Sequence, residues 1–451
     1  MSGCDLLVLG GGTAGLSAAR AARRRGASVV LVTDGPPGGD CTFTGCVPSK
    51  TLLAATRLPF SEAMARVHAT VAAVAHEESA EVLRSEGITV LDGRGTVLSR
   101  HQVEVNGEVV TARRLVLATG SAPLVPELPG LSDIAYLTNE TLFDLTELPE
   151  HLVVLGGGAI GCEMAQAFAR LGSQVTVLEG AERVLGKEEP EASAEIDTAL
   201  RADGVEIRTA TKVEAVAKVR GGVSLSTANG SVRGTHLLVA VGRRPSSQGL
   251  TALGLSTGPS GAIEVDARMR TSLRHVYAAG DVTGRMPFTH AADEMGRVAA
   301  TTALGRIPLR FAERAVPWVT FTDPEVARVG LTEALAAQRV RGARVVEVPM
   351  SEVDRARTSQ RTDGFVKVIV GPRLVTRNAG GGQVLGATIV AERAGEMIAE
   401  LTLAMRARVL AGRLAQTSHA YPTWSVAVQQ AVAQLFGGYG GRTPRPARTS
   451  S

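Results

Sequence analysis

Residues 5–15 read DLLVLGGGTAG, an apolar run that enters a glycine-rich turn. An alanine-rich stretch follows, and residues 29–32 are apolar again, so the pattern predicts a strand, a turn, a helix and a second strand. Glycines in such a turn let the backbone approach a diphosphate, which sits at the amide-rich start of the helix. We expect Gly10, Gly12 and Gly15 to make this contact.

The same pattern returns at residues 152–161, which read LVVLGGGAIG and precede a second helix-forming stretch and a strand. Two such units predict two bound dinucleotides, and the economical assignment is a tightly held FAD and an exchangeable nicotinamide cofactor. In the second unit the glycines that would approach the nicotinamide cofactor are Gly156, Gly158 and Gly161.

The residue that ends the second strand of each unit contacts the adenosine ribose. Glu179 holds this place in the second unit, and a carboxylate suits a free 2′-hydroxyl better than a 2′-phosphate. The sequence therefore predicts NADH, while Arg183 leaves NADPH open because a guanidinium can pair with a phosphate. The first unit carries Thr33 there, with Asp34 one residue later.

Composition narrows the class of protein. The 451 residues are 44% hydrophobic but only 3% aromatic, with 51 glycines, which favours α/β sheets built from small aliphatic side chains. The net charge of +4 comes without a basic face interleaved with aromatic residues, so we expect a solvated surface and no nucleic acid partner. No apolar run approaches the ~20 residues that cross a bilayer, which predicts no membrane partner and a cytoplasmic location.

Residues 38–50 read GGDCTFTGCVPSK and place Cys41 and Cys46 at the start of a predicted helix. Two cysteines at this spacing suit reversible disulfide chemistry with lowered thiol pKa values. The alternatives are a zinc half-site and a structural disulfide, but zinc needs further Cys or His ligands at matching spacing. We expect Cys4 and Cys162 to be small buried residues on a strand and a helix, and no metal site.

The segment 38–50 resembles the active-site segment of the pyridine nucleotide-disulfide oxidoreductases, which include lipoamide dehydrogenase, glutathione reductase and mercuric reductase. The resemblance covers almost the whole chain, through segments 117–121, 241–245, 277–281, 289–292 and 317–331. It implies that Asp281 holds the ribityl chain of the flavin, although a helix N-cap is the commoner role of such a carboxylate. The other contacts it implies are Gly39, Lys50, Ala118, Thr119, Gly120, Thr289, His290 and Ala291 for FAD and Gly242 for NAD(P).

The resemblance also implies the domain organisation, an α/β fold of two Rossmann-like dinucleotide-binding domains and a C-terminal α+β dimerisation domain. The expected parts are a split FAD domain at 1–148 and 268–310, an NAD(P) domain at 149–267 and the dimerisation domain at 311–436. The Gly-, Pro- and Arg-rich tail 437–451 is expected to be disordered. The implied partner is a second copy of the chain.

In the chemistry that the resemblance implies, hydride passes from NADH to the flavin, and the reduced flavin opens the disulfide. Cys46 is then the thiolate next to the flavin, and Cys41 is the outer thiol that meets a small-molecule acceptor. Lys50 and Glu163 are implied to form an ion pair beside the flavin, where Lys50 stabilises developing negative charge.

The chain departs from the family's pattern near its C-terminus. Disulfide-reducing members carry a His before a Pro and a Glu five positions after that His, but Tyr421 and Val426 stand in these places. A phenol with a pKa near ~10 is a poor base. His419 lies two residues away and is interpreted as a satisfied structural histidine in preference to a replacement base. A hydrogen bond from Tyr421 to a substrate or thiolate stays a hypothesis.

Four functions remain open on the sequence. The leading one is an NADH-dependent flavoprotein that passes electrons through Cys41 and Cys46 to a disulfide or another thiol-reactive acceptor. The absent base favours a flavin-only transhydrogenase, quinone reductase or diaphorase instead. Mercuric reduction is a weaker alternative, because the tail lacks the second cysteine pair that hands the metal inward. A redox-sensing binding protein is a third class.

Overall fold

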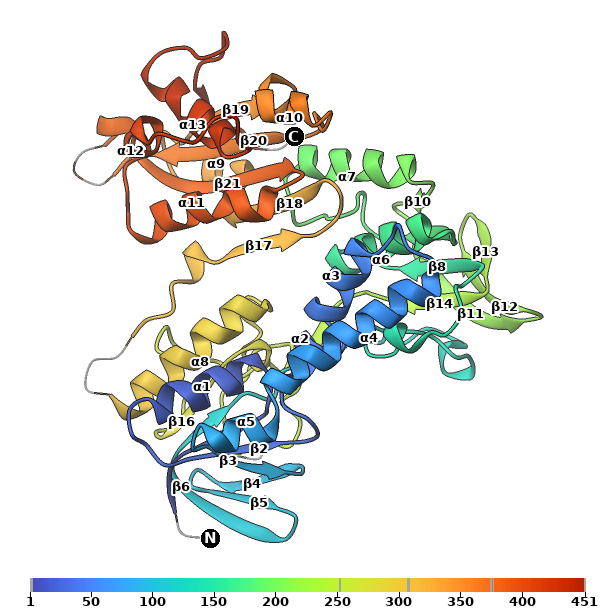
Figure 1. The fold of residues 1–451 in the computed structure, drawn as a ribbon, viewed down its shortest axis with the longest axis vertical. Coiled ribbons are helices and arrows are strands. Elements are labelled where there is room, and N and C mark those ends of the chain that lie inside the picture. Colours follow the sequence, from blue (N-terminus) through green and yellow to red (C-terminus); the bar gives the residue numbers. More distant parts are fainter. Residues whose placement is uncertain (1–2, 251–252, 306–308, 374, 376, 450–451) are drawn as a thin grey trace. The chain divides into compact units, whose positions relative to one another are not determined.

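The computed structural model describes residues 3–250, 253–305, 309–373, 375 and 377–449. The chain forms two compact units. Unit 1 comprises residues 1–127, 135–148 and 238–312, and unit 2 comprises 128–134, 149–237 and 313–451. Both contain helices and sheets, which confirms the predicted α/β class (Figure 1).

Unit 1 is built on a sheet in the order β3-β2-β1-β6-β5-β4, with β16 also paired to β6. β1, β2, β3, β6 and β16 pair in parallel, and β4 and β5 extend the first half of β6 in antiparallel fashion. β1 and β2 are almost entirely apolar, as strands buried on both faces of a parallel sheet are. The strands are β1 (Cys4–Leu9), β2 (Val29–Thr33), β3 (Thr89–Asp92), β4 (Gly95–Ser99), β5 (Gln102–Val105), β6 (Glu108–Leu117) and β16 (Val276–Ala278).

Helices α1 (Thr13–Arg23) and α8 (Thr289–Leu304) lie side by side in unit 1 (Figure 1). Their backbones touch, since a Cβ at Gly296 would stand 2.2 Å from the carbonyl oxygen of Ala14. Residues 38–50, called the cysteine segment below, form α2 (Gly39–Phe43) and the start of α3 (Cys46–Ala54). Helices α4 (Phe60–Glu77) and α5 (Ala80–Ser85) follow. A two-stranded ribbon joins β7 (Ser121–Pro123) to β15 (Arg243–Pro245).

The first part of unit 2 holds the second glycine turn. Its sheet has the order β10-β9-β8-β14, and a three-stranded sheet of β11, β12 and β13 accompanies it. Helix α6 (Ala159–Leu171) follows the turn, and α7 (Pro190–Ala202) comes after β9. The strands are β8 (His151–Leu155), β9 (Gln174–Leu178), β10 (Glu206–Arg208), β11 (Val213–Val219), β12 (Gly222–Thr227), β13 (Gly230–Gly234) and β14 (His236–Val239).

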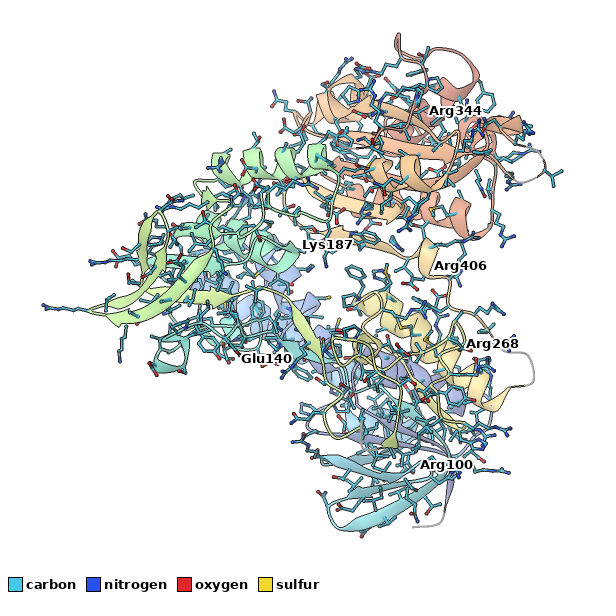
Figure 2. The ribbon with its side chains drawn as sticks, turned by 180° about the vertical axis from the view of Figure 1, so that it is seen from behind. Arg100, Glu140, Lys187, Arg268, Arg344 and Arg406 are labelled. Carbon is cyan, nitrogen blue, oxygen red and sulfur yellow. The ribbon has the colours of Figure 1, made fainter. Side chains whose placement is uncertain are left out.

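The C-terminal part of unit 2 is a sheet in the order β17-β18-β21-β20-β19-β22, antiparallel at every pairing described. Its apolar face packs on α11 (Ala394–Arg406), α12 (Ala411–Gln416) and α13 (Val426–Ala433), and the side chains between them are drawn in Figure 2. The strands are β17 (Pro317–Thr320), β18 (Glu325–Gly330), β19 (Arg344–Pro349), β20 (Phe365–Gly371), β21 (Gln383–Ala391) and β22 (Arg445–Pro446).

The tail differs from the expected disorder over the residues that the structure describes, which end at 449. β22 pairs with β19, and the Arg445 guanidinium holds the Glu333 carboxylate, with one bond at 2.8 Å. Arg442 reaches Glu352 at 2.6 Å. These charged contacts and the open edge of β19 give the polar tail partners that its composition does not reveal.

A fully buried lysine joins the two parts of unit 2. The Lys367 ammonium on β20 lies 2.9 Å from Glu191, 3.3 Å from Glu333 and 3.9 Å from Glu189. Burial opposes its charge, yet the pKa of Lys367 is raised because these carboxylates outweigh the loss of water. Burial also raises the pKa of Glu189, which is 3% exposed. Nearby, Arg328 on β18 donates to the carbonyl of Lys187, labelled in Figure 2.

We expect Lys367→Met to lower the free energy of unfolding by about 3 kcal/mol at pH 8, because it leaves the buried Glu189 carboxylate without the lysine ammonium. Without the lysine the folded-state pKa of Glu189 rises further above its unfolded value, so the folded state binds more protons and the variant loses stability as pH rises. Urea unfolding at pH 5 and pH 8 measures this. The exposed Lys218→Met is the matched control, and an equal loss at both pH values would contradict the argument.

Candidate functional site

The first glycine turn is closed by contacts that tolerate no side chain. A Cβ at Gly15 would stand 1.8 Å from the carbonyl oxygen of Gly10, and one at Gly10 would stand 2.2 Å from that of Ala118. Gly12 is the N-cap of α1, whose first amides therefore face the turn. The predicted segment 118–120 thus lies against this turn, as an FAD diphosphate site requires.

The cysteine segment passes directly over this helix start. Gly12 and Gly38 form a β-bridge, and a Cβ at Gly39 would stand 2.7 Å from the Cα of Gly12. Thr33 ends β2 with its hydroxyl donating to the carbonyl of Gly35 at 3.0 Å, while Asp34 is exposed. Thr33 therefore has its own partner, and Asp34 has the accessible polar atoms for a ribose.

Thr289, the first residue of α8, brings the two cysteines together. Its hydroxyl donates to the Cys41 sulfur at 3.2 Å and shares a hydrogen bond of 3.3 Å with the Cys46 sulfur. Both cysteines are thiols here, and the two thiols hydrogen-bond to each other. Cys46 is the first residue of α3, so two helix N-termini converge on the sulfurs and favour negative charge there.

The electrostatics distinguish the two thiols. The pKa of Cys41 is raised, first by its hydrogen bond to Cys46 and then by burial. The Glu78 carboxylate adds to this, and it also accepts a 2.6 Å hydrogen bond from Thr42. A raised pKa favours the protonated form of Cys41 within this pair.

Asp281 lies beside the start of β7 within unit 1. Its carboxylate accepts a 2.7 Å hydrogen bond from Ser121, at the start of β7. His290 stacks on Phe288 with ring centroids 5.8 Å apart, and Ala291 is buried in α8. The predicted residues of the FAD site that lie in unit 1 thus come from the glycine turn, the end of β2, the cysteine segment, the segment 118–120, the turn after β16 and the start of α8.

Two residues of this site, Glu78 and Arg243, were not among the site residues predicted from the sequence. Glu78 follows α4 outside every motif, so sequence reasoning could not place it beside the cysteines. Arg243 directly follows Gly242 in the segment 241–245, and its place in that motif was the available signal. Lys50 belongs to unit 1 and Glu163 to unit 2, and their ion pair stays a prediction.

The second glycine turn repeats the first. A Cβ at Gly161 would stand 1.9 Å from the carbonyl oxygen of Gly156, and Gly158 is the N-cap of α6. The Glu179 carboxylate accepts 2.6 Å and 2.7 Å hydrogen bonds from the amides of Gly157 and Ala181. Arg183 instead donates to the carbonyls of Gly186 and Glu188 at 3.0 Å and 3.1 Å.

The C-terminal candidates occupy different environments. The Tyr421 side chain is 73% exposed, and its hydroxyl donates to Asp354 at 3.0 Å, which raises its pKa. Both ring nitrogens of His419 have partners, Glu400 at 2.9 Å and the carbonyl of Thr417 at 3.0 Å. With both nitrogens engaged, His419 has the geometry of a structural histidine.

The remaining cysteines lie where the sequence placed them. Cys4 is 5% exposed on β1, and Cys162 is fully buried on α6, which confirms that prediction. Burial raises the pKa of Cys4 to about 11 and raises that of Cys162 as well. Among the described residues, no cluster of three or more His, Cys, Asp or Glu side chains could hold a metal ion.

The residues present fit an FAD. The closed glycine turn offers helix amides to a diphosphate, and the buried hydroxyl of Thr44, inside the cysteine segment, has no hydrogen-bond partner within the described chain. A polar group left unsatisfied beside two thiols and a cradle of amides is the chemistry expected of a site for a flavin dinucleotide.

Comparison with known proteins agrees with this geometry. Residues 4–296 match the model of the pyridine nucleotide-disulphide oxidoreductase family, and residues 316–432 match the dimerisation domain of that family. A mercuric reductase from Streptomyces lividans is 36% identical over 467 aligned residues, covering 96% of each chain. A dihydrolipoyl dehydrogenase from Chlamydia muridarum is 32% identical, covering 93% of this chain and 94% of that protein.

A solved structure supports the same assignment. The Cu(II) complex of the HOCl-induced flavoprotein disulfide reductase RclA from Escherichia coli matches with a TM-score of 0.88 and 29% identity, covering 96% of this chain and 99% of that one. The resemblance inferred from residues 38–50 is thereby confirmed. The chain belongs to the pyridine nucleotide-disulphide oxidoreductase family, enzymes that use FAD and NAD(P)H.

Proposed function

We propose that this enzyme passes electrons from NADH through FAD and the Cys41–Cys46 pair to a disulfide or another thiol-reactive acceptor. The observation that carries the proposal is the Thr289 hydroxyl, which contacts both sulfurs at 3.2 Å and 3.3 Å. Thiols that share one hydroxyl and hydrogen-bond to each other are close enough to form a disulfide after a small side-chain rotation.

When bound, FAD accepts hydride from the reduced nicotinamide and supplies two electrons to the disulfide. This chain's residues then control where the charge lies. The raised pKa of Cys41 and the place of Cys46 at the N-terminus of α3 together support a reduced pair in which a Cys41 thiol stands beside a Cys46 thiolate. The two helix N-termini and the Thr289 hydroxyl stabilise that thiolate.

The transfer to a disulfide acceptor balances with these groups. Cys41 passes its proton to the Cys46 sulfur and attacks one acceptor sulfur, which breaks the acceptor S–S bond and releases one thiolate. That thiolate takes the proton back from Cys46, and Cys46 attacks Cys41 to release the second acceptor sulfur. Two electrons leave with the acceptor, and the Cys41–Cys46 bond has formed.

NADH is the proposed donor. Glu179 directly follows β9, and two backbone amides hold its carboxylate at the position that receives a ribose 2′-hydroxyl. The sequence left NADPH possible because Arg183 could pair with its 2′-phosphate, but the Arg183 guanidinium donates to backbone carbonyls. These contacts support NADH over NADPH.

The proposed assembly is a homodimer, as the matched dimerisation domain supports. In a dimer of the family's kind, Tyr421 would reach the partner's outer thiol. Its raised pKa keeps the phenol protonated near neutral pH, so it would donate a hydrogen bond and would not act as a base. Among the described residues no helix has the length and apolarity of a membrane span, and we propose a cytoplasmic location.

A soft metal ion is the second candidate acceptor, because relatives of this length and similarity include mercuric reductases. The Cys41 and Cys46 thiols offer two soft ligands on either side of one hydroxyl. Reduction of Hg(II) by two electrons would re-form the Cys41–Cys46 disulfide.

Anaerobic titration of the holoenzyme with NADH tests the route of the electrons. We expect a long-wavelength thiolate-to-flavin charge-transfer band at two electrons in the native chain and its loss in Cys46→Ser. In Cys41→Ser we expect reduction of artificial dyes to survive while disulfide reduction is lost. A flavin that bleaches without the band would favour the flavin-only function, and quinones would then be screened before disulfides and metals.

The raised pKa of Cys41 predicts opposite shifts in two variants. Cys46→Ala removes its largest cause, so the pH midpoint for alkylation of reduced Cys41 should fall. Thr289→Val removes a hydrogen bond that lowers the same pKa, so the midpoint should rise. Iodoacetamide rates measured by peptide mass spectrometry give both midpoints, with buried Cys162 as the slow internal control. Shifts of the same sign would contradict the assignment.

Tyr421→Phe should lower kcat with a disulfide acceptor by about tenfold, less than the ~10²-fold or more of a well-matched general acid. Reduction of FAD by NADH should be unchanged, as stopped-flow absorbance would show. Tyr439→Phe is the matched control, since Tyr439 lies outside the proposed site and accepts its hydrogen bond from Gln430. Unchanged turnover would remove Tyr421 from the mechanism.

A further inference from the structure

An acidic residue stands directly before the outer cysteine. Asp40 lies in the first turn of α2, and its side chain is 46% exposed. The Gly12–Gly38 bridge and the close approach of Gly39 to Gly12 place this residue beside the start of α1. A carboxylate there would repel the diphosphate that the turn is built to bind, unless its charge is neutralised.

Arg243 supplies that neutralising charge. Its guanidinium forms an ion pair with the Asp40 carboxylate, and it donates to the hydroxyl and the carbonyl of Ser121, each at 2.7 Å. It also donates to the Asn139 side-chain carbonyl at 3.2 Å. The Arg243 side chain is only 19% exposed, so all three of its nitrogens are held in a fixed fork.

Asn139, which is bound to Arg243, also contacts the cysteine segment at a second point. The Asn139 amide donates to the carbonyl of Thr44 at 3.2 Å, while its carbonyl accepts from Arg243. The segment is therefore tied at Asp40, one residue before Cys41, and at Thr44, two residues before Cys46. A guanidinium fixed in β15 in this way holds the segment on both sides of Cys41.

The cluster also reaches Asp281. Ser121 donates to the Asp281 carboxylate at 2.7 Å and accepts from Arg243, and Arg243 lies 3.9 Å from Asp281. One guanidinium thus stands between two carboxylates, one on the cysteine segment and one at the proposed ribityl contact. Loss of its charge would leave both carboxylates facing an anionic cofactor.

We propose that Arg243 is a positioning residue that neutralises Asp40 and clamps the cysteine segment, so that an aspartate can stand between the redox cysteines and the FAD diphosphate. The inference rests on the proposed function for its effect on the thiols. Its effect on FAD retention does not depend on the identity of the acceptor.

A double-mutant cycle on the holoenzyme tests the pair. The readout is the rate of FAD release, followed by the recovery of flavin fluorescence after dilution. We expect Arg243→Gln to release FAD about tenfold faster, because the Asp40 carboxylate loses its counter-charge and repels the diphosphate. Asp40→Asn should release FAD at the native rate or more slowly, and the double variant should return to within about threefold of the native rate.

The second readout is the alkylation rate of Cys41 in the reduced enzyme, which reports the clamp. Asp40→Asn and Arg243→Gln should both accelerate alkylation, and Arg243→Lys should recover FAD retention but not the protection of Cys41, because an ammonium lacks the planar fork. Arg244→Gln, the exposed neighbour on the same strand, is the matched control and should match the native enzyme in both readouts.

Additive effects in the cycle would overturn the pair, since they would mean that Arg243 acts on the cofactor without Asp40. Should Arg243→Gln fail to fold, Asp40→Asn alone decides: a native rate of Cys41 alkylation in this variant would refute the clamp. If the NADH titration removes the cysteines from the redox path, the FAD-release cycle still tests Arg243, so the two failures remain distinguishable.

Discussion

The missing side chain of Gly15 is the constraint on which unit 1 depends. Its α-carbon lies so close to the Gly10 carbonyl that a Cβ would stand 1.8 Å away. This contact lets α1 begin directly after the strand that precedes it, so that its first amides face the turn. The segment 118–120, the cysteine segment and the start of α8 then gather around the same helix start.

The chemistry of the cysteine pair follows from what converges on it. A hydroxyl from α8 bridges the sulfurs, two helix starts favour one negative charge, and Glu78 opposes a second. The acidic Asp40 at the edge of this group is held by Arg243. The site therefore combines a net preference for one thiolate with a fixed position for both sulfurs, and dithiol chemistry requires both.

Local requirements could be predicted from the sequence, and distant partners could not. The glycine turns and the Cys41–Cys46 spacing are short patterns whose backbone or covalent geometry is fixed by neighbours in the chain. Thr289 and Cys41 are 248 residues apart, and Arg243 and Asp40 are 203 apart, so no pattern contained their pairing. The tail read as disordered from composition, but Arg445 meets Glu333 across 112 residues.

The last strand has a consequence for how the chain is made. β22 (Arg445–Pro446) covers the edge of β19, which begins at Arg344, far earlier in the chain. An uncovered edge strand can pair with other chains, and nascent polypeptides expose such edges while they wait for their partners. During synthesis the C-terminal sheet of this protein thus keeps an open edge at β19 until residues 445–446 have been made and β22 can cover that edge.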